Sequence, residues 1–386
     1  MMRKKSVFKI FLICLSIFSI SCKAKTQKDE IISVEVTPST HKWYSFTKDG
    51  FENISTIQNA IGTIKKPWTE AVRIADAVSM PITVEGQAQN AFVAVNRLGI
   101  LSFLDGKLTL HPDNTLYAHK TVSALIIQNG IPFVTLYKNT FFNDNPTDFD
   151  TFLLQFKTDS GISYPVLSLK NLNVPTDSEI NDYVFDGNSW ICSVKTQSDT
   201  QTSFSYISWQ SSVPLQTISP VDASSKITIK NSTEEAFRSL KMPKDFSKAP
   251  ARAQKLLSHI PESFGFSAEC RTPASPKSMS FVHGIDEENA ESSLISAKIQ
   301  ITDLWAAAIF EDGTMYFAGA LSGKRILNNG KTIALRLPKL PENYVYSHFA
   351  ISNGELLVSW EEQSFFETGS SGFLTVNLSK LLYNND

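Results

Sequence analysis

The stretch FAISNGELLVSW at residues 349–360 contains an apolar run, an Asn-Gly pair and a second apolar run. Asn353 and Gly354 suit a tight turn in which both central residues need a positive φ angle. Asn-Gly or Asp-Gly between apolar runs is the strongest short-range signal for a β-hairpin. This stretch therefore predicts two antiparallel strands joined by a two-residue turn.

The same unit recurs four more times toward the N-terminus. The other copies are residues 92–103 around Gly99, 124–136 around Gly130, 183–194 around Gly187 and 305–317 around Gly313. A further apolar run follows three of the hairpins across a polar segment, beginning at Phe152, Phe204 and Phe373. A hairpin followed by another antiparallel strand is the unit that one blade of a β-propeller requires.

These repeats predict an all-β fold, and we expect a β-propeller of seven or eight degenerate blades. About 340 folded residues at roughly 45 residues per blade give that number. Stacked β-sandwiches are the alternative, because the same strands could build them. We expect Trp43 and Phe46 to lie in a strand that closes the ring beside Phe373–Leu378 at the C-terminus, an arrangement that is common in propellers.

Residues 231–262 break the strand pattern and predict a small helical insertion. Glu234 and Glu235 follow Ser232 and Thr233, and acidic residues suit the first turn of a helix. A second helical piece is expected at 251–260 and a separate helix at 287–296. An insertion of this size acts either as a lid or binding element or as a solvated cover for one end of a sheet.

The composition excludes several classes of protein. With 42% hydrophobic and 11% aromatic residues among 386, the chain can bury a large core, which rules out global disorder. Lys and Arg total 36 and Asp and Glu total 38, a balance that argues against a nucleic-acid binder. Residues 1–21 hold four positive charges, so removing them from the net charge of -2 leaves -6.

The first 21 residues have the features of a secretory signal peptide. A basic stretch over residues 1–9 precedes an apolar run over 10–20, which is shorter than the roughly 20 apolar residues of a spanning helix. The block Ser19-Ile20-Ser21-Cys22 resembles a bacterial lipobox, in a relaxed version because Ser19 stands where Leu is usual. The resemblance implies that Cys22 is acylated and becomes the first residue of the mature protein.

This resemblance also implies where in the cell the protein is located. We expect an envelope lipoprotein attached to the membrane through acyl chains such as palmitate on Cys22. Lys23 rather than Asp after that cysteine favours the outer membrane, on either its periplasmic or its surface face. We expect residues 22–40 to be the lipidated N-terminus and a flexible tether, and residues 41–386 to form one domain.

Few residues in the sequence indicate a catalytic or metal-binding role. The sequence has no phosphate-binding Gly-rich loop, nucleophile elbow or zinc-protease motif. His111 and His119 flank a short turn and could share a metal, although histidines without a shared role are far commoner at such spacing. Residues 143–150 concentrate oxygen ligands suited to Ca²⁺ but lack the Gly and Glu of an EF-hand. We therefore expect neither a metal nor another cofactor.

The cysteines and tryptophans each leave two interpretations open. Once Cys14 leaves with the signal and Cys22 takes lipid, Cys192 and Cys270 either pair in an oxidising envelope or stay buried as free thiols. Five tryptophans either fill the core or line a sugar-binding pocket, and their strand positions favour the core. They are Trp68, Trp190, Trp209, Trp305 and Trp360.

Three functions are consistent with this sequence. We expect a monomeric, non-catalytic binding or scaffold module whose protein or glycan ligand is unknown, and no nucleic-acid partner. The first alternative is an envelope glycan hydrolase or lyase with carboxylates converging at a central channel. The second alternative is an assembly factor for outer-membrane proteins, by analogy of size and architecture with lipid-anchored propellers in that role.

Overall fold

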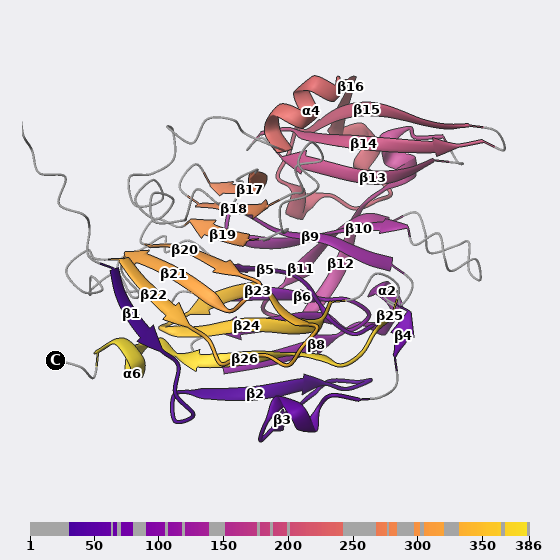
Figure 1. The fold of residues 1–386 in the computed structure, drawn as a ribbon. Helices are drawn as coiled ribbons and strands as arrows, with labels where there is room; N and C mark the ends of the chain where they lie inside the picture. Colours follow the sequence, from indigo (N-terminus) through magenta and orange to yellow (C-terminus); the bar gives the residue numbers. More distant parts are fainter. Residues whose placement is uncertain are drawn as a thin grey trace, which may run out of the picture. The chain divides into compact units, whose positions relative to one another are not determined.

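Short antiparallel strands dominate the computed structural model (Figure 1). Residues 32–386 form one compact unit. The structure describes residues 31–62, 65–67, 71–79, 90–104, 107–117, 120–138, 151–175, 178–185, 188–198, 201–241, 268–275, 278–283, 297–301, 305–319, 332–363 and 367–383.

Three sheets of four strands each come from consecutive segments of the chain. The first has the order β5-β6-β7-β8, with strands at Ile74–Ser79, Ala91–Val95, Gly99–Leu104 and Lys107–Pro112. The second has the order β9-β10-β11-β12, with strands at Lys120–Gln128, Ile131–Lys138, Thr151–Lys157 and Ile162–Ser168. The third has the order β13-β14-β15-β16, with strands at Ser178–Phe185, Trp190–Gln197, Thr202–Ser211 and Ile227–Asn231.

Two larger sheets combine segments that are distant in sequence. The seven-stranded sheet β1-β22-β21-β20-β19-β18-β17 has strands at Ile31–Glu35, Thr332–Arg336, Thr314–Gly319, Trp305–Phe310, Ala297–Ile301, Ser278–His283 and Ala268–Ser275. The five-stranded sheet β23-β24-β26-β2-β3 has strands at Tyr344–Ser352, Glu355–Glu362, Ser371–Asn377, His41–Phe46 and Phe51–Ile54. A two-stranded ribbon pairs β4 (Lys66–Pro67) with β25 (Glu367–Thr368).

Helices are short throughout the described ranges. They are α2 (Asn114–Tyr117), α3 (Ala223–Lys226), α4 (Glu234–Lys241), α6 (Leu378–Tyr383) and the 3₁₀ turns η1 (Ile57–Asn59), η4 (Leu169–Leu172) and η5 (Leu215–Thr217). The predicted all-β class is therefore confirmed.

The predicted insertion begins as expected with α4, where the Thr233 hydroxyl accepts a hydrogen bond from the Ala236 N–H at 3.1 Å. The helices expected at 251–260 and 287–296 lie outside the described residues.

All five predicted hairpins are present as paired strands. Between β23 and β24, Asn353 has φ +46° and Gly354 has φ +79°. Asn129 and Gly130 repeat this geometry between β9 and β10, with φ +52° and +77°. Two successive positive φ angles are the requirement of a type I′ turn, which explains why an Asn-Gly pair marks each of these reversals.

The three predicted third strands are also confirmed. The apolar runs that begin at Phe152, Phe204 and Phe373 lie in β11, β15 and β26, and these strands pair with β10, β14 and β24. The predicted count of seven or eight blades is not confirmed. The described strands form five sheets of four or more strands, and β19 pairs with β20, so the seven-stranded sheet joins two expected units in one ladder.

Five strands that open a hairpin carry a β-bulge against the second strand. The ladder skips one residue in β5, β9 and β13, at Ala75, Ser123 and Asn181, and two in β17, at Arg271 and Ala274. In β23, Ser347 and His348 together lie opposite one residue of β24, Ser359. A bulge bends its strand and increases the local twist. The bulges lie at similar places in five different sheets, which marks these sheets as variants of one structural unit.

The bulged strands also pack against one another. β5 contacts both β23 and β9, while β13 contacts β10 and β17, and β20 contacts β23. Polar side chains join these strands: Asp76 Oδ2 accepts a hydrogen bond from the Leu125 N–H at 2.8 Å, and Ser79 Oγ accepts one from the Ile351 N–H at 2.7 Å. Gln300 of β19 donates to the carbonyl oxygens of Ala77 and Phe349. Side-chain hydrogen bonds therefore connect backbones of different sheets.

The N-terminal strands complete both large sheets. β2 pairs with β26, with Trp43 opposite Leu374 and Tyr44 opposite Phe373, so the predicted pairing of N- and C-terminal strands is confirmed. The structure corrects the extent of the tether, which was expected to continue to residue 40. Residues 31–35 form β1 at the edge of the seven-stranded sheet, because apolar and polar residues alternate there and suit a half-exposed strand.

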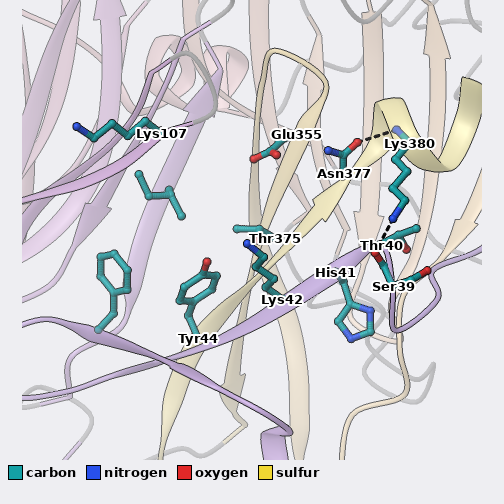
Figure 2. A pocket seen from close by; sticks show the side chains of 12 residues that line it. Ser39, Thr40, His41, Lys42, Tyr44, Lys107, Glu355, Thr375, Asn377 and Lys380 are labelled. Carbon is teal, nitrogen blue, oxygen red and sulfur yellow. Dashed lines mark hydrogen bonds between the residues drawn. The ribbon is translucent and has the colours of Figure 1, made fainter.

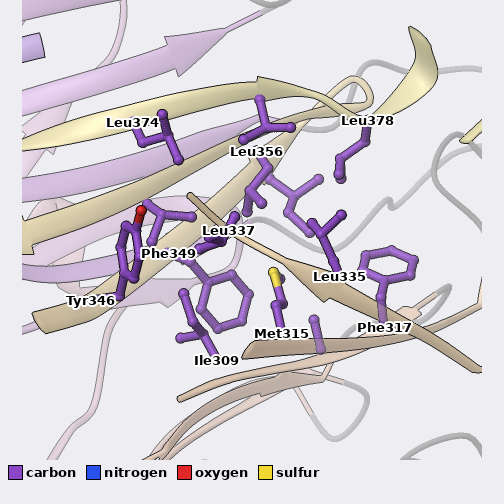
Figure 3. Packing of buried hydrophobic residues seen from close by; sticks show 14 of the residues in the cluster. Ile309, Met315, Phe317, Leu335, Leu337, Tyr346, Phe349, Leu356, Leu374 and Leu378 are labelled. Atoms are coloured by element: carbon purple, nitrogen blue, oxygen red, sulfur yellow. The ribbon is translucent and has the colours of Figure 1, made fainter. Parts of the chain in front are cut away.

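The largest described core cluster lies between the seven-stranded and five-stranded sheets. Figure 3 shows Ile309, Met315 and Phe317 of the first sheet facing Phe349 and Leu374 of the second. Trp305 and Trp360 belong to this cluster and are fully buried, while Trp190 and Trp209 stack at 5.2 Å in the core between two four-stranded sheets. The core interpretation is thus confirmed for four tryptophans, and Trp68 lies outside the described residues.

Candidate functional site

A pocket of about 590 Å³ lies where β2 joins β26, and we call it the seam pocket (Figure 2). Pockets of about 300–1,000 Å³ are typical of small-molecule sites. Its lining residues are Ser39, Thr40, His41, Lys42, Tyr44, Phe51, Lys107, Leu108, Glu355, Thr375, Asn377 and Lys380.

Strand alternation places the polar side chains of the seam pocket on one face of the five-stranded sheet. In β2, Trp43 is buried toward the core, so Lys42 and Tyr44 point to the opposite face. The strand register then sets Lys42 opposite Thr375 of β26, and Glu355 of β24 opposite Asn377. Three neighbouring strands therefore contribute adjacent polar groups to the same space.

The opposite wall comes from β8 of a neighbouring four-stranded sheet, which contributes Lys107 and Leu108. Leu108 packs in one core cluster with Tyr44 and Phe373. The Tyr44 and Phe373 rings are stacked, with centroids 4.7 Å apart and planes inclined by 15°. This apolar cluster joins the two sheets that line the pocket and so holds its two walls together.

The electrostatic character of the seam pocket is basic. Lys42, Lys107 and Lys380 are exposed, and Glu355 is half-buried. Burial raises the pKa of Glu355, while Lys42 and a hydrogen bond with Asn377 lower it. Three ammonium groups and one carboxylate give this lining a formal charge of +2, or +3 when Glu355 is protonated, whereas the chain after residue 21 carries -6.

Two of the lining residues tie the C-terminal helix to the turn before β2. The Lys380 ammonium group donates to the Ser39 carbonyl oxygen at 3.3 Å, and the Lys380 N–H donates to Asn377 Oδ1 at 2.6 Å (Figure 2). The ion pairs within the described ranges involve neither Lys42 nor Lys107. Figure 2 shows the Lys107 ammonium group pointing away from the other lining side chains. Lys42 acts on Glu355, and Lys380 has a structural partner.

A second pocket, of about 140 Å³, has a different chemistry. Side-chain amides of Gln128, Asn129, Asn188 and Gln210 surround it beside Trp190. Gln210 Nε2 donates to Asn188 Oδ1 at 2.7 Å, so part of this hydrogen-bonding capacity is already used. The Trp190 ring is stacked on Trp209 and only 2% exposed, which leaves no open aromatic face for a sugar.

Of the two histidines that could share a metal, the structure describes His111 alone. His111 Nε2 lies 2.9 Å from Ser102 Oγ, its ring packs against Phe156, and burial lowers its pKa. His119 and the oxygen-rich segment at 143–150 lie outside the described residues. Within the described ranges, no group of three or more His, Cys, Asp or Glu is placed to hold a metal ion.

The structure separates the two interpretations of the cysteines. Cys192 is a free, fully buried thiol, and burial raises its pKa to about 12. A disulfide with Cys270, whose side chain is outside the described part, is therefore not formed. Cys22 and the signal segment also lie outside the described residues. Of the helices that the structure describes, none has both the length and the apolar character needed to cross a membrane.

Sequence reasoning missed the lysines of the seam pocket. Lys42, Lys107 and Lys380 come from β2, β8 and the C-terminal helix, and no motif connects them. One signal was available: in the run His41–Phe46, Lys42 and Tyr44 alternate with Trp43, so they share the face opposite the core. The partner residues on β8 and β24 could not be chosen without the packing of the sheets.

The fold defines an all-β protein of several antiparallel sheets, two of which are completed by N-terminal strands. Comparison with known proteins identifies the family of this chain. A family of unknown function (DUF8086) matches residues 32–380, and the chain belongs to it. An uncharacterized lipoprotein of Treponema pallidum (strain Nichols) is 24% identical over 413 aligned residues, which cover 90% of each chain.

Proposed function

We propose that this protein is a lipid-anchored envelope lipoprotein that acts as a binding module, with its ligand site in the seam pocket. The single observation that carries the binding role is the seam pocket itself, where amines, hydroxyls and an amide from two sheets surround one open space. The T. pallidum relative carries the name lipoprotein and aligns over 90% of this chain, which supports the anchor at Cys22.

The architecture that we propose is a β-propeller. The recurring bulges support it, and so does the closed series of contacts that runs from β5 through β9, β10, β13 and β17 into the seven-stranded sheet, then from β20 to β23 and back to β5. In this arrangement β17–β19 and β20–β22 with β1 serve as two blades, which gives six blades rather than seven or eight. The N-terminal strands then close two adjacent blades.

Binding fits the described chemistry better than catalysis. A glycan hydrolase commonly uses two carboxyl groups on either side of the scissile bond. The described lining of the seam pocket contains one carboxylate, Glu355, and three lysines. We therefore propose a binding or scaffold role rather than the hydrolase or lyase alternative.

A photo-crosslinking experiment tests the binding role. A photoreactive residue replaces Lys42 in the seam pocket, and a matched variant carries it at Lys230, an exposed lysine on β16 of another sheet. After irradiation of intact cells, we expect a discrete adduct from position 42 and none from position 230. Equal adduct yields from the two positions would count against a ligand site in the seam pocket.

Palmitate labelling tests the anchor separately. The protein should incorporate labelled palmitate and fractionate with the outer membrane, as Lys23 after the lipidated cysteine predicts. Cys22→Ala should lose the label, whereas Cys192→Ala, which changes a buried thiol, should keep it. Undiminished label in Cys22→Ala would refute the anchor.

A further inference from the structure

Resting on the proposed role of the seam pocket as a binding site, we infer that its ligand is a neutral saccharide. The polar contacts come from four lining side chains on three neighbouring strands, β2, β24 and β26. They are Lys42, Tyr44, Glu355 and Thr375. The saccharide therefore binds across the pairing of N-terminal and C-terminal strands.

These four side chains share one face of the five-stranded sheet. Lys42 and Tyr44 alternate with the buried Trp43, and Lys42 stands opposite Thr375 in the strand register. Figure 2 shows the ammonium group of Lys42 and the hydroxyl of Tyr44 directed to the same side of the sheet. Glu355 lies close enough to Lys42 for that ammonium group to lower the pKa of its carboxyl. One ligand can therefore reach all four groups.

The charges that face this space balance each other. Of the three lining lysines, Lys107 points away from the other side chains, and Lys380 donates to the Ser39 carbonyl oxygen. Lys42 and the carboxylate of Glu355 are left to face the ligand. An anion would be repelled by Glu355 and a cation by Lys42, whereas an uncharged ligand is repelled by neither.

The hydrogen-bonding groups match the hydroxyls of a sugar. Within the described ranges, neither the Tyr44 nor the Thr375 hydroxyl has a hydrogen-bond partner in the protein. Asn377 accepts from the Lys380 N–H and hydrogen-bonds Glu355, which holds that carboxyl in place and leaves it lone pairs for further donors. A sugar hydroxyl both donates and accepts, so one can donate to Glu355 while its neighbour accepts from Lys42.

The rest of the lining suits the C–H groups of a sugar ring. Phe51 and Leu108 line the pocket from β3 and β8, and both are half-buried. Phe51 packs edge-on against Tyr44, with ring centroids 5.6 Å apart. A wholly apolar ligand would fit these two side chains but would leave the polar groups around Glu355 without partners, which costs free energy. The volume of about 590 Å³ is in the range of small-molecule sites and suits a short oligosaccharide.

An oligosaccharide array tests the inference. The full-length protein, purified in a detergent that has no sugar headgroup, is applied to neutral members built from glucose, galactose, mannose and N-acetylglucosamine, and to acidic members. We expect binding to one or more neutral members and weaker binding to the acidic ones. Calorimetric titration then measures the affinity for the neutral member with the strongest signal. This affinity should change less than about twofold with salt, because the ligand has no charge to screen.

Variants locate the site. Glu355→Gln should weaken binding of that oligosaccharide about tenfold, because it removes a charged acceptor. Tyr44→Phe removes one hydroxyl and should weaken binding about fivefold. The matched controls lie outside the pocket: Glu235→Gln on α4 and Tyr206→Phe on β15 should bind as the unaltered protein does. None of these variants should lower the thermal unfolding temperature by more than a few degrees.

Three results would overturn the inference. They are binding to no neutral member, tighter binding to acidic members or to the zwitterionic dipeptide alanylalanine in the same titration, and equal affinities of the pocket variants and their controls. If crosslinking from position 42 still yields an adduct, the proposed binding role stands and only the saccharide assignment fails. If that adduct is missing as well, the proposed function itself fails.

Discussion

Two sheets, β13–β16 and β23-β24-β26-β2-β3, differ in how far apart in the sequence their strands lie. The first, which we call the local sheet, uses one continuous segment, residues 178–231. The second, which we call the non-local sheet, combines residues 41–54 with 344–377. Both bury tryptophans and both begin with a bulged strand. The non-local sheet contributes most of the seam pocket, so the candidate site depends on the pairing of N-terminal and C-terminal strands.

The local sheet should depend most on its stacked tryptophans. Trp209→Ala removes a fully buried ring that stacks on Trp190, and we expect it to lower the free energy of unfolding by about 3–5 kcal/mol. Urea unfolding followed by circular dichroism measures the loss. Ser205→Ala, at an exposed position of the same strand, should change the free energy by less than about 0.5 kcal/mol. A loss below about 1 kcal/mol for Trp209→Ala would mean that the stack does not stabilise this sheet.

The stability of the non-local sheet should be most sensitive to substitution where β26 lies closest to β2. A Cβ at Gly372 would lie 2.0 Å from the Tyr44 carbonyl oxygen, so Gly372→Ala must displace the β2 backbone. We expect a loss of about 1–3 kcal/mol, by the usual cost of overpacking, together with faster proteolysis near β2.

Gly50→Ala is the matched control for that variant. Gly50 lies in the turn between β2 and β3, where the nearest atom to an added Cβ is 3.8 Å away. Its effect on stability should stay within about 0.5 kcal/mol. Equal effects of the two alanine variants would show that the close contact of β26 with β2 does not limit the stability of this sheet.

The smallest expected effect concerns pH and the seam pocket. Because burial raises the pKa of Glu355 above its ordinary value of 4.5, the folded protein holds this proton more tightly than the unfolded chain. The resulting stabilisation is fully present below pH 4.5 and is lost as the pH rises through the raised pKa. Glu355→Gln avoids that loss, so it should match the unaltered protein at low pH and become slightly more stable toward neutral pH.

Urea unfolding at several pH values between 4 and 8 measures this difference. The half-buried carboxyl of Glu311, whose pKa burial also raises, is present in both proteins and cancels in the comparison. Lys42→Gln should act in the opposite direction and enlarge the loss, because Lys42 lowers the pKa of Glu355. A stability difference that does not vary with pH would contradict this role of Glu355.

The comparison of the two sheets also explains what the sequence could predict. Within the local sheet, the hairpin and third strand follow from short-range patterns, because each strand pairs with its neighbour in the chain. The pairing of Trp43 and Phe46 with the C-terminal strand was predictable from its place in closed β folds. The short strand β1 was missed because its five residues follow a polar stretch and pair with β22, which is distant in the sequence.

The bulges and the seam pocket could not be predicted for a different reason. A bulge is defined by two strands together, so Ser123 or Asn181 shows nothing unusual in the sequence alone. The pocket is lined by residues of two sheets, and their placement depends on how those sheets pack through Tyr44 and Leu108. Long-range packing, rather than local preference, determines both features.

Hydrogen exchange with and without the adduct crosslinked from position 42 tests most directly the claim that the pairing of N-terminal and C-terminal strands forms the ligand site. A ligand held in the seam pocket should slow amide exchange in β2, β26 and β8, because binding stabilises the contact between their sheets. Amides of β13–β16 should exchange at unchanged rates. Slowing confined to β13–β16, or equal slowing in both sheets, would contradict the account.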